Sequence, residues 1–435
     1  MVDSMRRLAL LLVLGCSSRE GGPAVEADAS LPDAEARDSE ALDTDAPDAG
    51  SFDAEPADTG LPEVGPSPDD AGPSDADAGD GSSCPFPADQ TYAPVSVAAL
   101  ERPGYRMAVT DPVFGTKLMR ITDEAAFGEV SPRHHYSKDQ PWNADQTLIL
   151  INDHLLDGTT YAYRERLELP DEARWSSVHP NTIFGTRDNA FVSFDVITKT
   201  TSVLHTFPGY LRIYLGPWEG NLSQDDRTVA FTTADGPGGD VIVYDVAADT
   251  VLSSRSLASL GFTGAGIDWV SVSPSGEFVV INGRGSSDSS VKVYDRNLDF
   301  LRTVAETGEH GDLGYDAEGR EVFVQVCPYR MARLDDGVVT DLPIGDECGH
   351  ISTRAHRRPG WAYSSSNNAD GDIFAIKLDG SGLVERFTHH RSLEDSYEAE
   401  PHAVPSPDGL RVIFASNWGG TAPINAFAVG PSCAH

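Results

Sequence analysis

Short runs of alternating apolar and polar residues, each introduced by a tight polar turn, recur along most of the chain. Residues 406–416, with the sequence SPDGLRVIFAS, show the pattern most clearly, because Ser406, Asp408 and Gly409 form a turn signal ahead of an apolar strand. Such turns reverse the chain sharply, and a period of two residues indicates a half-buried β-strand. The same template fits four further segments well and two others weakly: residues 143–153, 223–233, 273–283, 316–326, 179–186 and 357–365.

The spacing of these copies predicts a repeat fold. Equivalent turn positions in the seven copies lie 37, 44, 49, 43, 41 and 49 residues apart, and some copies are followed by a second alternating strand, as in residues 240–250 and 290–300. A period of about 44 residues with roughly four short strands per unit is typical of a β-propeller, so we predict an all-β fold of seven blades with almost no helix. Residues 105–112 and 116–123 precede the first copy, and we expect them to complete the last blade and so remove its exposed edges.

The first residues of the chain predict export. A basic pair, Arg6-Arg7, precedes seven apolar residues, 8–14, which is the order of a secretory signal peptide. This run is too short to span a bilayer, which takes about 20 residues. The stretch VLGC ending at Cys16 resembles a bacterial lipoprotein signal, which implies removal of residues 1–15 and lipidation of Cys16. An ordinary secretory signal with an incidental cysteine is the alternative.

An acidic segment of low hydrophobicity follows the signal. Residues 17–82 contain 19 acidic and two basic residues and a single aromatic residue, Phe52. Because such a composition cannot offset the entropy of ordering, we predict a disordered tether over residues 16–82, with a reach of about 45 Å. The formal charge of the whole chain is −36, of which −20 remains for the predicted propeller, residues 83–435.

These charges limit the partners that we expect. Nucleic-acid binding needs clustered Lys and Arg, so a chain this acidic argues against it. No segment after the signal is long and apolar enough to span a membrane. We therefore expect a monomer that meets the membrane only through its lipid anchor. The lipoprotein resemblance implies the outer membrane of a Gram-negative cell, with the periplasmic and outer faces both left open.

The chain has five cysteines, and two of them lie at the ends of the predicted propeller. Cys84 opens the repeat region and Cys433 nearly ends it. In a closed ring those ends meet, and an exported chain tolerates disulfides. A Cys84–Cys433 bridge is therefore our leading pairing, and in the loop-entropy account it contributes roughly 4–5 kcal/mol.

Cys327 and Cys348 form a second pair with two nearby histidines, His310 and His350. Two thiolates and two imidazoles suit a tetrahedral zinc ion, which would be structural and would connect two successive blades. A Cys327–Cys348 disulfide with the histidines close by is the alternative, since the same export favours oxidised cysteines.

Polar residues gather where each innermost strand is expected to lead into its turn. The innermost strands of a propeller line the central funnel, so side chains there are candidates for ligand binding. These candidates are His134, His135, Asp268, Trp269, His310, Asp312, His350, His356, Glu400 and His402. Loop filler is the alternative for any single histidine. Three further histidines, His205, His389 and His390, are expected in surface loops.

Two segments carry a resemblance to known propellers. Residues 400–420, EPHAVPSPDGLRVIFASNWGG, are similar to the repeats of TolB-like propellers and of oligogalacturonate lyases. Residues 114–123, FGTKLMRITD, and 134–154, HHYSKDQPWNADQTLILINDH, resemble the opening of propeller-type polysaccharide lyases, including ulvan lyases. The resemblance covers most of residues 100–420. It implies cleavage of a uronate-containing polysaccharide by β-elimination.

β-Elimination needs a base for the acidic C–H, a cation or donor for the neighbouring carboxylate, and an acid for the leaving oxygen. The resemblance to ulvan lyases implies two histidines that move protons and an arginine, with a tyrosine beside it, that holds the carboxylate. The matching positions are His135 or His134, His154, Arg212, and Tyr214 or Tyr210.

Oligogalacturonate lyases instead hold a metal with several histidines and a glutamine near their last blades. In this chain His402 matches that pattern, but Glu400 stands where another histidine is expected, and no glutamine matches. This departure argues against a galacturonate-specific metal site.

An anionic polysaccharide would also need a local basic funnel in a propeller of charge −20. The basic residues available for it are Arg133, Lys138, Arg212, Arg284, Arg330 and Arg354. We therefore expect an exported, lipid-anchored propeller that acts as a polysaccharide lyase. The rival is a non-catalytic TolB-like propeller that binds glycans, peptides or cell-envelope proteins. Convergence of His135, His154 and Arg212 in one funnel distinguishes the two.

Overall fold

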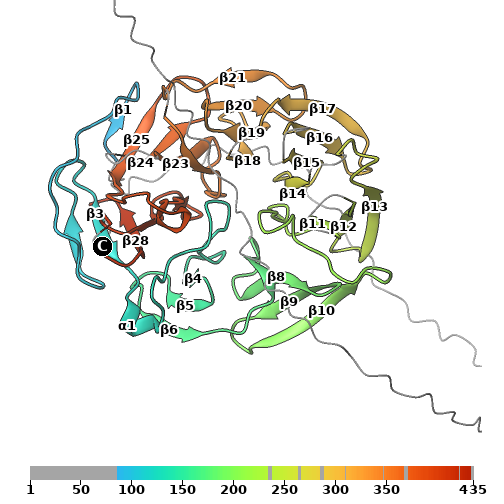
Figure 1. The fold of residues 1–435 in the computed structure, drawn as a ribbon, viewed down its shortest axis with the longest axis horizontal. Helices are drawn as coiled ribbons and strands as arrows, with labels where there is room; N and C mark the ends of the chain where they lie inside the picture. Colours follow the sequence, from blue (N-terminus) through green and yellow to red (C-terminus); the bar gives the residue numbers. More distant parts are fainter. Residues whose placement is uncertain are drawn as a thin grey trace, which may run out of the picture. The chain divides into compact units, whose positions relative to one another are not determined.

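A computed structural model describes residues 86–432, apart from short gaps at 234–237, 263–265, 285–288, 309, 346, 367–370 and 421. Seven antiparallel sheets are arranged in a ring, as Figure 1 shows. The predicted all-β, seven-bladed propeller is confirmed. Helical structure among these residues amounts to α1 (Glu124–Phe127) and the 3-10 turn η1 (Tyr397–Ala399). The predicted signal and tether and the Cys84–Cys433 pair lie outside the described residues.

The first four blades follow one another along the chain. From the axis outward their strands are, for blade 1, β4 (Leu148–Ile151), β5 (His154–Asp157) and β6 (Tyr163–Arg166); for blade 2, β7 (Asp171–Trp175), β8 (Thr182–Arg187), β9 (Ala190–Asp195) and β10 (Thr200–Thr206); for blade 3, β11 (Thr228–Thr232), β12 (Asp240–Asp245) and β13 (Thr250–Ser256); and for blade 4, β14 (Ile267–Val272), β15 (Phe278–Gly283), β16 (Val291–Asp295) and β17 (Phe300–Ala305). In blades 1 and 3 the innermost segment pairs through single bridges, Trp142 with Ile149 and Tyr214 with Thr232.

The last three blades complete the ring. Blade 5 contains β18 (Gly311–Tyr315), β19 (Glu321–Gln325), β20 (Arg330–Arg333) and β21 (Val339–Asp341); blade 6 contains β22 (Gly349–Ser352), β23 (Trp361–Ser366), β24 (Asp372–Lys377), β25 (Val384–His389) and β1 (Ala88–Asp89); and blade 7 contains β26 (Val404–Pro405), β27 (Val412–Ser416), β28 (Asn425–Gly430), β3 (Lys117–Arg120) and β2 (Ala108–Thr110). No helix within the described residues is long and apolar enough to cross a membrane.

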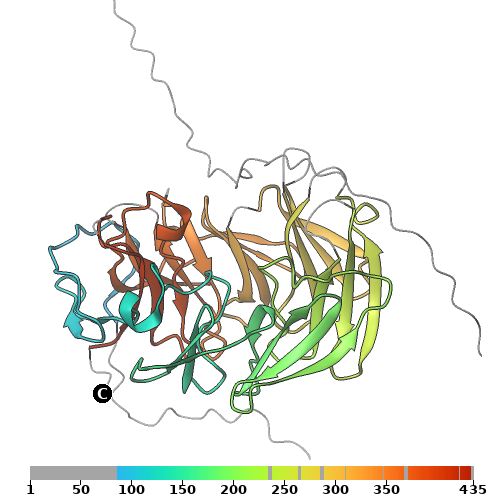
Figure 2. The ribbon, with the colours of Figure 1, turned by 60° about the horizontal axis from the view of Figure 1, so that its bottom comes forward.

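The first and last described strands close the ring in blade 7, as predicted. β3 pairs with β28 in antiparallel register, with Leu118 opposite Val429, and β2 adds a further strand outside β3. Figure 1 shows these blue N-terminal strands beside the red C-terminal ones, and Figure 2 shows the same blade from a second direction. Closure pairs the two edges that would otherwise be exposed.

The repeated polar turn has a local physical cause. In four blades the first residue of the turn accepts a hydrogen bond from the backbone N–H five residues later: Ser406 from Arg411, Ser273 from Phe278, Ser223 from Thr228 and Asn143 from Leu148. Gly409 adopts φ +71°, where residues with a side chain are strained. The turn thus fixes the hairpin between the innermost and second strands, which is why it recurs in the sequence.

Strand direction determines which residues share a face of the ring. Because neighbouring strands in a blade are antiparallel, the first and third strands begin where the second and fourth end. We call the face that holds the first residues of β14, β18 and β22 the entry mouth. Most of the predicted funnel residues lie at this mouth, whereas His356 follows β22 and lies toward the other face.

Candidate functional site

Three histidines from successive blades meet at the entry mouth. His310 directly precedes β18, His350 lies in β22, and His402 lies two residues before β26. The ring centroids of His310 and His350 are 4.2 Å apart, and those of His350 and His402 are 4.1 Å apart with the planes nearly perpendicular. His350 and His402 are fully buried. Three inner strands therefore place three imidazoles in contact around the axis.

Glu400 completes a cluster of possible metal ligands with two of these histidines. Its Oε2 lies 3.4 Å from His350 Nδ1 and 3.6 Å from His402 Nε2. All three atoms are buried and lack a hydrogen-bond partner. Bonds of about 2.1 Å at angles of 90–110° around a cation place ligand atoms roughly 3.0–3.4 Å apart. The His–Glu cluster (His350, Glu400 and His402) thus has the donor set and spacing of a divalent-cation site.

Burial sets the protonation of this cluster. It lowers the pKa of His350 and of His402 well below the ordinary value, and the neighbouring Arg133 acts in the same direction. Both imidazoles are therefore neutral at physiological pH, with a lone pair to offer a cation. Burial also raises the pKa of Glu400 to about 7, with Arg133 opposing the shift. A bound cation would favour the ionised carboxylate.

One contact in the cluster would have to open for a cation to bind. Arg133 Nη1 lies 3.3 Å from His402 Nδ1, and since a guanidinium only donates, this contact makes Nδ1 an acceptor. Coordination through Nε2 puts the proton on Nδ1 instead, so the arginine would lose this partner. Arg133 keeps the carbonyl oxygens of His134 and His135 as acceptors, each at 3.1 Å.

Basic and phenolic groups form the wall beside the cluster. Lys138 is buried with its Nζ 2.8 Å from Glu219 Oε2 and 3.7 Å from the ring centroid of Trp269. The hydroxyl of Tyr136 lies 3.3 Å from His310 Nδ1, and burial raises its pKa well above the usual value, so it stays protonated. Lys138 and Arg133 both lower the pKa of His350, which places their charges within electrostatic reach of it.

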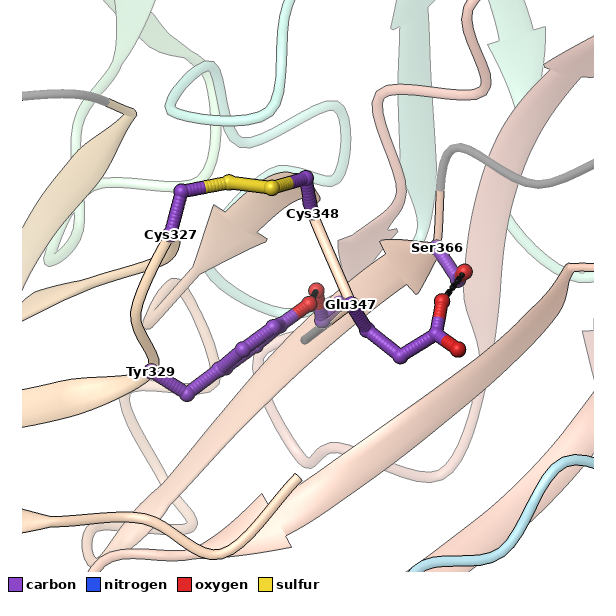
Figure 3. The surroundings of a disulfide bond; sticks show 6 residues. Cys327, Tyr329, Glu347, Cys348 and Ser366 are labelled. Carbon is purple, nitrogen blue, oxygen red and sulfur yellow. Dashed lines mark hydrogen bonds between the residues drawn. A yellow bond between two sulfur atoms is a disulfide. The ribbon is translucent and has the colours of Figure 1, made fainter. Parts of the chain in front are cut away.

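The predicted zinc site is wrong in its cysteines. Cys327 and Cys348 form a disulfide, shown in Figure 3, so neither sulfur is a thiolate ligand. The alternative that the sequence left open is the one the structure contains. His350 is directed instead to Glu400 and His402. Beside the bridge in Figure 3, Ser366 donates a hydrogen bond to Glu347.

The residues inferred from the ulvan-lyase resemblance are not brought into one constellation. His135 is half-exposed and pairs with Asp139. Arg212 pairs with Asp171 at 2.8 Å, and its guanidinium lies 5.1 Å from the ring centroid of Tyr214. Among the interactions of the described residues, none joins His135, His154 and Arg212 to one another.

The reason is radial position within the blades. His154 begins β5, the third layer of blade 1 from the axis when its bridged inner segment is included, whereas Arg212 precedes the innermost segment of blade 3. Strand direction places both at the entry mouth but at different distances from the axis. The hydroxyl of Tyr210 donates to Asp240 Oδ2 at 2.8 Å.

The other funnel candidates divide between wall and scaffold. His134 is buried with its Nε2 against the carbonyl oxygen of His402. His356 Nδ1 lies 3.1 Å from Gln224 Nε2, and it lines a small cavity of about 20 Å³ with Arg174 and Arg354.

Four of the six predicted basic residues are committed to ion pairs with acids. The pairs are Arg212 with Asp171, Arg284 with Asp268, Arg330 with Asp341 and Arg354 with Asp312. The basic funnel therefore reduces to Arg133 and Lys138.

The sequence reasoning missed Tyr136 and Tyr397 and misplaced two histidines. The ring of Tyr397 lies 4.9 Å from that of His402, and η1 carries it there. Its place three residues before Glu400 was an available signal. His389 and His390, predicted in surface loops, are fully buried, because β25 and the chain after it pack against neighbouring strands.

Comparisons with known proteins find similarity in structure alone. No family model matches the sequence, and no curated protein matches it. An oligogalacturonate lyase in complex with manganese superposes with a TM-score of 0.55 at 14% identity, over 80% of this chain and 96% of that chain. An oligogalacturonate lyase from Vibrio parahaemolyticus gives 0.53 at 12%, over 74% and 96%. TolB from Acinetobacter baumannii gives 0.35 at 14%, over 64% and 75%. The chain is therefore a seven-bladed propeller similar in fold to the oligogalacturonate lyases.

Proposed function

We propose that the propeller binds a divalent cation at the His–Glu cluster and cleaves a uronate-containing polysaccharide by β-elimination at the entry mouth. The observation that carries this proposal is the convergence of three buried, unpartnered ligand atoms, from His350, Glu400 and His402. The similarity in fold to a lyase solved with manganese supports the choice of substrate class. Glu400 replaces the expected histidine but supplies an oxygen ligand that suits manganese.

The residues around the cluster match the needs of the reaction. When bound, the cation would neutralise the substrate carboxylate and so acidify the adjacent C–H. His310, in ring contact with His350, would accept that proton as the base. The C–O bond to the leaving sugar then breaks as the carbon–carbon double bond forms. Tyr136, which stays protonated, would give its proton to the leaving oxygen.

Arg133 and Lys138 give the mouth the local positive charge that the acidic propeller otherwise lacks. Their charges already reach His350. Since electrostatic interactions at a surface are screened beyond about 8 Å, the remaining −20 charge of the propeller does not decide what binds there. We propose that Arg133, released from His402, turns to the substrate carboxylate or hydroxyls.

The test uses the full-length protein, dialysed against chelator and then supplied with Mn²⁺ or left without it. We expect uronate polysaccharide to yield an unsaturated product, seen by its ultraviolet absorbance, only with Mn²⁺. His350→Ala should abolish both Mn²⁺ binding and product, whereas His179→Ala, an exposed histidine in blade 2, should change neither. A wild-type protein that binds Mn²⁺ without forming product from any uronate polysaccharide would leave the non-catalytic binding propeller.

We also propose export and lipid anchoring through Cys16, on the signal described above. Cys16→Ser should abolish incorporation of labelled fatty acid and release the protein from the membrane fraction. Continued membrane association of that variant would contradict the anchor.

A further inference from the structure

A second cluster of ligand atoms lies in blade 1, apart from the His–Glu cluster. It combines Glu129, in the chain segment after α1, with Asp153 and His154 at the hairpin between β4 and β5. His154 Nε2 lies 3.1 Å from Glu129 Oε1 and 3.5 Å from Asp153 Oδ1. The three donor atoms thus have the spacing that a bound cation imposes on its ligands.

The histidine is the observation that separates this cluster from an ordinary acidic patch. His154 is fully buried, and its ring is held between Phe127, with centroids 4.9 Å apart, and Tyr163, at 5.7 Å. Neither of its ring nitrogens has a hydrogen-bond partner. An unpartnered buried nitrogen costs free energy unless something occupies the position it faces.

The geometry is that of coordination rather than of a hydrogen bond. Nε2 and Glu129 Oε1 are within hydrogen-bond distance, yet they do not form one, because Nε2 is not directed at that oxygen. Ligands of one cation lie about 3 Å apart while each is directed at the ion between them. Asp153 Oδ1 is likewise buried without a partner.

Arg166 prepares the cluster without filling it. Its Nε donates to Asp153 Oδ2 at 2.7 Å, which orients the carboxylate and leaves Oδ1 directed at His154. Its Nη2 is 3.8 Å from Glu129 Oε1, too far for a hydrogen bond. The side chains of Glu129 and Asp153 are 27% and 30% exposed, so an ion can enter from solvent.

We propose that Glu129, Asp153 and His154 form a second divalent-cation site. One imidazole and two carboxylates suit Mn²⁺ or Zn²⁺. The ion would tie the segment that leaves the closing blade to the first hairpin of blade 1. Its role is to hold this seam of the ring, and it does not depend on the proposed lyase activity.

The experiment counts Mn²⁺ bound per chain to the full-length protein by equilibrium dialysis, together with the shift in thermal midpoint that the ion causes. We expect Glu129→Gln and Asp153→Asn each to bind one Mn²⁺ fewer than the wild type. His350→Ala should also lose one, and the Glu129→Gln/His350→Ala protein should lose both. Glu165→Gln removes a carboxylate from β6 in the same blade and should bind as the wild type does.

Two results would overturn the proposal. One is wild-type stoichiometry in both Glu129→Gln and Asp153→Asn. The other is loss of all Mn²⁺ binding in His350→Ala alone, which would leave one site in the molecule. Glu129→Gln changes a partly exposed side chain and preserves its size, so it tests the site even if Asp153→Asn, which disturbs the pair with Arg166, does not fold.

Discussion

Removal of the carboxylate of Asp312 should destabilise the propeller by about 3–5 kcal/mol, because it leaves a buried guanidinium unpaired. Asp312 is 3% exposed and Arg354 6%. The carboxylate accepts Arg354 Nη2 at 2.7 Å and Arg354 Nε at 3.0 Å, and its Oδ2 also accepts the backbone N–H and the hydroxyl of Thr353 at 2.8 and 2.9 Å.

This pair also bears on the candidate site. Asp312 lies in β18, two residues after His310, and Arg354 follows β22, four residues after His350. The pair therefore aligns the innermost strands of blades 5 and 6 below the two imidazoles. We expect Asp312→Ala to weaken Mn²⁺ binding at the His–Glu cluster even under conditions where the protein stays folded.

The assay is urea unfolding followed by tryptophan fluorescence. Asp299→Ala, which breaks an exposed pair with Arg255, is the matched control and should cost less than about 1 kcal/mol. Asp312→Ala/Arg354→Met should recover much of the loss, since it removes the unpaired charge. A loss below about 1 kcal/mol for Asp312→Ala, or a double variant as unstable as the sum of the single variants, would refute the reasoning.

Three further outcomes follow from the scaffold. Cys327→Ser should lower the free energy of unfolding by about 3 kcal/mol in urea, because the bridge to Cys348 closes a loop with a sequence separation of 21; equal unfolding with and without reductant would contradict this. Burial would raise the pKa of Asp408, but the hydrogen bonds it accepts within its turn hold that pKa below the ordinary value. Its stabilisation is therefore present above pH about 4 and is lost below it, so the urea midpoints of wild type and Asp408→Asn should converge as the pH falls through that range; a constant difference would count against it. Gly409→Ala should cost at least about 1–3 kcal/mol by thermal unfolding, because φ is +71° and the new Cβ would meet the Tyr363 hydroxyl at 2.1 Å; an unchanged midpoint would refute this reading.

The number of blades could be predicted because its signal is local. The Ser or Asn that begins each turn accepts a hydrogen bond from five residues ahead, and the strand after it must alternate to bury one face. Each copy carries this information within about a dozen residues, so no long-range contact is needed to recognise it. Ring closure by β3 and β28 was predictable for a related reason, since unpaired edge strands are costly.

The composition of the site was only partly predictable. The sequence indicated that His310, His350, Glu400 and His402 begin innermost strands, and closure of the ring makes such positions neighbours. It assigned His310 and His350 to two cysteines, however, because spacing along the chain does not reveal that those sulfurs bond to each other.

Depth from the axis was decided by the tertiary structure alone. His135, His154 and Arg212 all lie toward the entry mouth, as strand direction requires, yet His154 sits on the third strand layer of blade 1 and Arg212 pairs across to blade 2. A period of two residues tells which face a side chain takes but not how far its strand lies from the axis. The sequence by itself thus determined the repeat, the closure and the mouth, whereas packing between blades decided which polar groups meet, because those contacts join residues far apart in the chain.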